Sequence, residues 1–281
     1  MSGESSAQKI NDDPLSIPQL VVFLLLDGWG IAPESEGNAI NRKNSKNFTK
    51  LASEYPAKIL QVEDLSEAKR YATLGDNGNF CQLLIEKGIK QTYITESEKS
   101  SAVLAYFVGS KNEDKIESKI ISSPVCDSYN LNPEMSLDEV SRVAIKEIRE
   151  NKSQFIFIST ANLDTVSACG DFEAVQKAVQ KVDNFVGKIT EEVLLKKGIL
   201  VISSAGGNAE KSIDVVTELI NKENTLNPVP LLVVGTEYKG LSLFGQDAPG
   251  GDLSLLNPAG NLSDIPGLLL DLLKIKNDGN I

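Results

Sequence analysis

Short apolar runs alternate along this chain with amphipathic stretches that have the period of a helix. Six runs have the length and the aliphatic content of buried strands, and they span residues 20–26, 57–62, 91–95, 155–159, 199–203 and 229–235. The amphipathic stretches lie between these runs. The alternation predicts an α/β fold, with a mostly parallel sheet sandwiched by helices.

Three of the expected helices carry start signals. Ser136 with Glu139 three residues later has the spacing of a capping box, and Asp171 stands before a long amphipathic stretch. Ser263 precedes a stretch with Pro266 in its first turn. We expect helices to begin at these positions, with the serine or aspartate side chain as the N-cap.

Composition and charge narrow the classes of partner. The 281 residues carry a net charge of −11 and 41% hydrophobic residues. Basic residues form no cluster, so neither nucleic acid nor an anionic membrane is expected as a partner. No apolar stretch has the length of a membrane span or of a signal peptide, which predicts a cytoplasmic protein. We expect a disordered arm at 1–18, one domain at 19–275 and a tail at 276–281.

A candidate site follows the first apolar run. Asp27 stands directly after this run and is followed by Gly28 and Gly30. In open α/β sheets, ligands bind at the carboxyl ends of strands, and a carboxylate there suits a metal ion or the activation of a nucleophile. An aspartate before a glycine also stabilises turns through its own side chain. Spacing alone leaves both interpretations open.

The segment around Asp27 resembles a known family. Residues 21–40, VVFLLLDGWGIAPESEGNAI, resemble the opening of the cofactor-independent (2,3-bisphosphoglycerate-independent) phosphoglycerate mutases, which belong to the alkaline-phosphatase superfamily of metalloenzymes. Further segments are similar to that family in the same order along the chain: 90–108, 129–140, 155–170, 207–210 and 227–230. The resemblance implies an alkaline-phosphatase-like core over most of the chain.

The resemblance also implies which metal ligands are present and which are replaced. In the family, aspartates and histidines hold two metal ions, and Asp27 and Asp164 match two of these aspartates. Four further ligand positions of the family correspond here to Ala168, Ala205, Gly206 and Asn224. The chain contains no histidine at all. The metal site is therefore expected to be degenerate, with Asp27 and Asp164 as its vestiges.

A second departure concerns the domain that carries the phosphorylated serine of the family. The resemblance places this inserted domain where the present chain has only residues 58–78, a segment with room for a strand and a connection. We call residues 58–78 the connecting segment. Lys99 matches an active-site lysine of the family, which makes it a possible phosphate contact. Without its former neighbours, we interpret Lys99 as a solvated surface lysine.

These departures favour a protein without the family's catalysis. Loss of the nucleophile and of four ligands removes groups that act as a unit. The leading hypothesis is a pseudoenzyme with a binding, scaffolding or regulatory role, no cofactor, and an unknown protein partner or self-association. One alternative is a residual metal-dependent mutase or phosphohydrolase that uses Asp27, Asp164 and Lys99 with weakly bound Mn²⁺ or Mg²⁺. The other is a structural subunit of an assembly.

Overall fold

The computed structural model describes residues 20–245 and 247–275. Within these ranges the strands form one seven-stranded sheet in the order β2-β7-β6-β1-β5-β3-β4. The strands are β1 (Val21–Leu26), β2 (Ala57–Leu60), β3 (Gln91–Glu96), β4 (Glu117–Ile121), β5 (Phe155–Thr160), β6 (Ile199–Ser203) and β7 (Val229–Val234). β7 pairs antiparallel with β2 and β6, and the other pairs are parallel. The predicted mostly parallel α/β sheet is confirmed.

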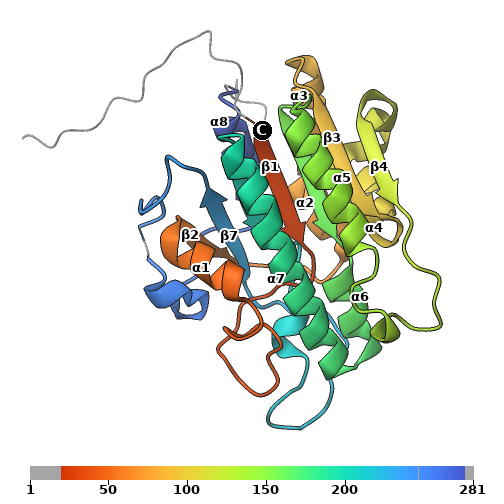
Figure 1. The fold of residues 1–281 in the computed structure, drawn as a ribbon, viewed down its shortest axis with the longest axis vertical. Helices are drawn as coiled ribbons and strands as arrows, with labels where there is room; N and C mark the ends of the chain where they lie inside the picture. The colour runs from red at the N-terminus through yellow and green to blue at the C-terminus, as the bar shows by residue number, and fades with distance from the viewer. Residues whose placement is uncertain (1–19, 246, 276–281) are drawn as a thin grey trace, which may run out of the picture.

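Helices cover both faces of this sheet (Figure 1). They are α1 (Lys46–Glu54), α2 (Glu67–Leu74), α3 (Asn79–Glu86), α4 (Ser97–Ala102), α5 (Leu137–Glu150), α6 (Asn162–Cys169), α7 (Phe172–Leu195) and α8 (Asp264–Leu272). Buried side chains of α1, α5 and α7 pack in one hydrophobic cluster, and those of α2, α3 and α8 pack in another. No helix within the described ranges is both long enough and apolar enough to cross a bilayer.

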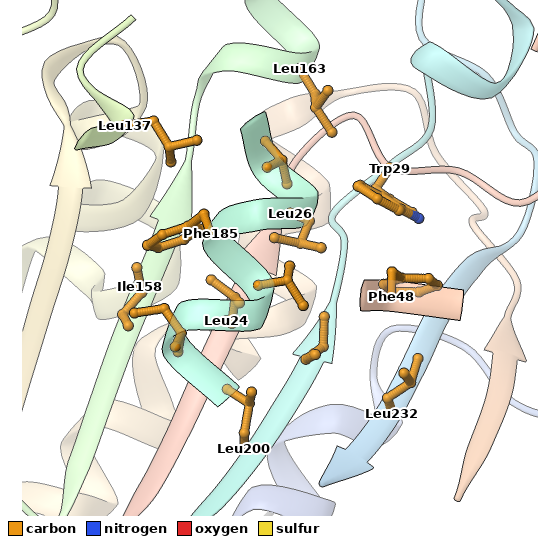
Figure 2. Packing of buried hydrophobic residues seen from close by; sticks show 14 of the residues in the cluster. Leu24, Leu26, Trp29, Phe48, Leu137, Ile158, Leu163, Phe185, Leu200 and Leu232 are labelled. Carbon is orange, nitrogen blue, oxygen red and sulfur yellow. The ribbon is translucent and has the colours of Figure 1, made fainter. Parts of the chain in front are cut away.

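The central strand β1 separates the two clusters. Val22, Leu24 and Leu26 belong to the cluster under α7, whereas Val21, Phe23 and Leu25 belong to the cluster on the opposite face. All six side chains are fully buried, because side chains alternate between two covered faces. Figure 2 shows Leu24 and Leu26 among the side chains that face α7. This burial explains why the strand reads as a continuous apolar run that ends at Asp27.

The start of α1 is capped from another helix. Asp183 of α7 accepts hydrogen bonds from the backbone N–H of Phe48 at 2.8 Å and of Asn47 at 3.0 Å. These are first-turn N–H groups without a partner inside the helix. The local residue Ser45 makes no side-chain cap bond. Asp183 is separated from them by more than a hundred residues, so only the folded chain provides this cap.

All three predicted helix starts are confirmed, because α5, α7 and α8 begin directly after Ser136, Asp171 and Ser263, but two of the three expected side-chain caps do not form. Ser136 has φ −99° and ψ 20°, which is not the extended backbone of an N-cap, and its Oγ donates to the Ser122 carbonyl at 2.7 Å. Ser263 already has helical φ and ψ, and its Oγ donates to Asn261 Oδ1 at 2.6 Å. Asp171 is confirmed, because its side chain accepts from the Ala174 N–H at 3.1 Å.

The strand predictions need two corrections. The second run ends at Leu60 rather than residue 62, because Gln61 makes only an isolated bridge with Asn261. β4 is absent from the prediction, since its sequence ESKII lies on the sheet edge, mostly exposed, without a continuous apolar run. The proposed arm at 1–18 and tail at 276–281 lie outside the described residues.

The Asp183 cap predicts that Asp183→Ala lowers the free energy of unfolding by about 2 kcal/mol, because one buried and one partly buried N–H group lose a charged acceptor. Urea denaturation of both proteins measures the difference. Glu191→Ala, at an exposed position of the same helix, is the matched control and should change stability far less. Equal losses in both variants would show that helix propensity, rather than the cap, is responsible.

A buried carboxyl group at the end of β3 predicts a pH dependence. Glu96 is fully buried, its Oε1 has no hydrogen-bond partner among the described residues, and burial raises its pKa from 4.5 to about 7. The folded chain therefore holds this proton more tightly than the unfolded chain does. The stability associated with Glu96 is complete below pH 4.5 and is lost as the pH rises to about 7.

Glu96→Gln should consequently be more stable than the wild type at pH 8, by up to about 3 kcal/mol, and equally stable near pH 4.5. Denaturation curves across this pH range test the sign. Glu36→Gln, in an exposed loop, is the control and should follow the wild type. A difference that is constant with pH would contradict titration of Glu96.

Candidate functional site

Three neighbouring strands bring the predicted site residues together. Asp27 follows β1, Lys99 lies in α4 directly after β3, and Asp164 lies in the first turn of α6 after β5. The strand order β1-β5-β3 makes the three strands adjacent, and they run in the same direction. Their carboxyl ends therefore meet at one edge of the sheet, where ligands bind in open α/β folds.

The glycine after Asp27 permits a close approach of α6. Gly28 has φ +91°, and a Cβ at this position would lie 2.7 Å from the backbone nitrogen of Asp164. A larger residue would therefore suffer both backbone strain and a collision. The Gly28 N–H donates to the Gly206 carbonyl at 3.0 Å, which joins the ends of β1 and β6. This glycine is therefore required both for the backbone conformation and for the packing of α6 against the end of β1.

Lys99 lies at the centre of the site. Its Nζ is 2.8 Å from Asp27 Oδ2 and 2.6 Å from Asp164 Oδ2, and it also pairs with Glu67 Oε1. Only 4% of the Lys99 side chain is exposed. The interpretation of Lys99 as a solvated surface residue is therefore wrong. The reason is tertiary: three carboxylates from other elements surround an amino group that looks unpaired in the sequence.

The connecting segment contributes more than a strand and a connection. It contains α2, which carries Glu67, Arg70 and Tyr71 to the site. The Tyr71 hydroxyl donates to Asp27 Oδ2 at 3.3 Å. None of these residues was singled out from the sequence. The available signal was the helical spacing of Tyr71 and Leu74 after Ser66, which indicates an amphipathic helix but not which charged residues it buries.

Arg70 lies beside two of the replaced ligand positions. A Cβ at Gly206 would be 2.7 Å from Arg70 Nη1, so the guanidinium fills the volume that a side chain at Gly206 would occupy. With its amide oriented to satisfy both neighbours, Asn224 donates to Asp164 Oδ1 at 2.8 Å and accepts from Arg70 Nη2 at 3.2 Å. Nε and Nη1 of Arg70 have no partner in the part of the chain that the structure describes.

The other two replaced positions lie apart from these contacts. Ala205 is fully buried in the cluster below the sheet edge. Ala168 is one turn after Asp164 on α6 and is exposed. Neither side chain carries a polar atom that could bind a ligand. The structure thus brings Asp27, Asp164, Lys99 and Asn224 together, while Gly206 provides space for Arg70.

Burial and the lysine act in opposite directions on the two aspartates. Burial raises the pKa of Asp27 above its ordinary value, although the Lys99 charge opposes this. Burial also acts to raise the pKa of Asp164, but Lys99 and Arg70 outweigh it, so this pKa lies below the ordinary value. Burial would lower the pKa of Lys99, yet the surrounding carboxylates hold it well above its usual range. Lys99 is therefore charged at neutral pH.

Two of the three serines near the site donate to backbone carbonyls. Ser203 Oγ donates to the Pro230 carbonyl and Ser204 Oγ donates to the Gly206 carbonyl, both at 2.7 Å. Ser167 Oγ is buried without a partner in the described ranges. A nucleophilic serine needs a base that accepts its proton, and neither engaged hydroxyl contacts one.

The family's metal ions can be tested against this geometry. Oxygens of Asp27, Glu67 and Asp164 lie within 4.8 Å of one another, which is a spacing that suits a bound cation. However, Lys99 Nζ already contacts all three carboxylates. A metal ion at this point would have to displace the ammonium group. With Lys99 in place, the residues do not fit a metal ion.

Comparisons with known proteins agree on the family. The model of the Metalloenzyme superfamily matches residues 19–277. A 2,3-bisphosphoglycerate-independent phosphoglycerate mutase of Clostridioides difficile is 33% identical over 244 residues, which is 86% of this chain and 44% of that protein. The chain spans less than half the length of this and other curated phosphoglycerate mutases that it matches.

Solved structures agree on the fold. A phosphoglycerate mutase from Leishmania mexicana superimposes with a TM-score of 0.59 at 20% identity, covering 71% of this chain and 37% of that chain. Alkaline phosphatase from the Antarctic bacterium TAB5 superimposes with a TM-score of 0.58 at 10% identity, covering 92% and 99%. The predicted alkaline-phosphatase-like core is confirmed. This chain belongs to the metalloenzyme superfamily, and its sequence relatives there are 2,3-bisphosphoglycerate-independent phosphoglycerate mutases.

Proposed function

We propose that this chain is a catalytically inactive phosphoglycerate-mutase-like protein with a binding, scaffolding or regulatory role. The observation that carries the proposal is the position of Lys99. Its ammonium group pairs with both aspartates that match metal ligands of the family, Asp27 and Asp164. Two carboxylates that are neutralised in this way are unavailable to a catalytic metal ion.

The chemistry of proton transfer supports the same proposal. The chain has no histidine, which is the commonest general base near neutral pH. Ser203 and Ser204 donate to backbone carbonyls rather than to a base. The Tyr71 hydroxyl, which contacts Asp27, has a pKa well above its ordinary value because of burial and the Asp27 charge. Tyr71 therefore remains a neutral hydrogen-bond donor.

The loop at 214–226 favours a second candidate, self-association into an assembly. Five apolar side chains of this loop are more than half exposed: Val215, Val216, Leu219, Ile220 and Leu226. Several large exposed apolar side chains on one loop favour an interaction surface. The same loop carries Asn224, which contacts Asp164 and Arg70. A partner that covered the loop would therefore lie next to the lysine-centred site.

The inactive state predicts no interconversion of 3-phosphoglycerate and 2-phosphoglycerate with Mn²⁺ or Mg²⁺ present. Loss of cooperating groups lowers rates by at least on the order of 10⁴-fold, so turnover should not exceed that of a blank. A full-length phosphoglycerate mutase is the positive control for the assay. Metal-dependent turnover that disappears in Asp27→Ala would instead support the residual metalloenzyme.

The exposed loop predicts that the mass in solution rises with protein concentration. Sedimentation equilibrium measures this mass. Val216→Asp combined with Leu219→Asp should keep the chain monomeric, because two buried charges would oppose the contact. Val125→Asp, at a fully exposed site in another loop, is the control and should associate like the wild type. A wild-type mass that stays monomeric at every concentration would eliminate self-association.

A further inference from the structure

The carboxylates at the sheet edge form a cation site with one member that the family resemblance does not supply. Asp27 and Asp164 match the family, whereas Glu67 comes from α2 in the connecting segment. One oxygen from each residue lies within 4.8 Å of the other two. Glu67 is also the most accessible of the three, with 41% of its side chain exposed compared with 1% for Asp27. The site is therefore buried at Asp27 and accessible to solvent at Glu67.

The ammonium group of Lys99 lies within this site, and its number of N–H donors equals the number of carboxylates there. A lysine ammonium has three N–H donors and no acceptor. Here it has three carboxylate partners, from Asp27, Glu67 and Asp164. Each donor can therefore meet one charged acceptor without water or metal. Such charge-assisted bonds are the stronger hydrogen bonds of proteins, and the low exposure of the group reduces screening.

We infer that Lys99 Nζ is the resident cation of the Asp27–Glu67–Asp164 site, where it excludes divalent metal ions, and that removal of this amino group opens a metal-binding site. The site differs from the family's metal centre because Glu67 replaces the missing ligands and a side chain replaces the ion. The ion that it would accept is a hard divalent cation such as Mn²⁺ or Mg²⁺, since all three ligands are carboxylates.

A second observation shows that one carboxylate oxygen of the site has no partner while Lys99 occupies the site. Asp27 is fully buried, and its Oδ1 has no hydrogen-bond partner within residues 20–245 and 247–275. A buried carboxylate oxygen without a partner is costly and calls for an explanation. A divalent ion takes more oxygen ligands than an ammonium group has donors, so an ion bound in place of Lys99 would make use of this oxygen.

Arg70 adds a second fixed positive charge beside the first. Its guanidinium lies against Gly206 and reaches Asp164 through Asn224. Three carboxylates and two basic side chains therefore meet at this edge of the sheet. One helix, α2, supplies both Glu67 and Arg70, so it adds one charge of each sign. When all five groups are ionised, three negative and two positive charges give the site a formal charge of −1 without any bound ion. This small net charge attracts a metal ion only weakly.

The inference does not rest on the proposed lack of activity. It concerns which cation the site holds, and it is tested by binding alone. Calorimetric titration with Mn²⁺ compares the wild type with Lys99→Ala, and Lys99→Arg is the control that retains a positive charge. Electron paramagnetic resonance of the same samples reports whether Mn²⁺ is bound.

The wild type and Lys99→Arg should show no saturable Mn²⁺ binding. Lys99→Ala should bind one Mn²⁺ per chain at least about 100-fold more tightly than the wild type, because the three carboxylates then have only Arg70 to balance their charge and repel one another. This binding should be lost in Lys99→Ala combined with Glu67→Gln, which distinguishes the new ligand from Asp27 and Asp164.

Two results would overturn the inference. One is saturable Mn²⁺ binding by the wild type that disappears in Asp164→Ala. This comparison does not depend on whether any Lys99 variant folds. The other is a folded Lys99→Ala that binds no better than the wild type. Lys99→Ser is the substitute if Lys99→Ala does not fold, and the same two criteria apply to it. A failure here leaves the activity assay untouched, so the two proposals are tested separately.

Discussion

The contact between the Lys99 ammonium and three carboxylates is the interaction on which the site depends. It joins α4, the turn after β1, α6 and α2, so it connects both cores of the protein to the same edge of the sheet. A buried ion pair contributes little net stability when it is complete, yet removal of one partner is costly because it leaves uncompensated charge. The cluster therefore constrains which side chains can occupy this edge.

The sheet makes that contact possible. Adjacent parallel strands place the ends of β1, β5 and β3 side by side, and Gly28 lets α6 approach closely enough for Asp164 to reach Lys99. The connecting segment then places α2 beside this edge. Where the family resemblance predicts a missing domain, this helix brings an acid, an arginine and a tyrosine to the aspartates.

Prediction and structure differ most where polar groups find partners that are distant in the sequence. Six of the seven strands and the long helix after Asp171 were predictable, because apolar periodicity and an extended N-cap are local properties. Asp183 capping α1, and Ser136 bonding Ser122 instead of its own helix, were not. A hydroxyl or carboxylate has several possible partners within reach of its backbone, and only packing selects among them.

The sequence by itself determined the α/β sheet and the family, because these follow from hydrophobic period and from matched segments. It placed Asp27 at a strand end and singled out Asp164 through the family resemblance, but it predicted a solvated surface position for Lys99, which is buried. Only the tertiary structure decided that Lys99 is buried between them with Glu67 from α2. The physical reason is that the charge state of a site depends on distances between elements, and these distances are set by packing rather than by any local pattern.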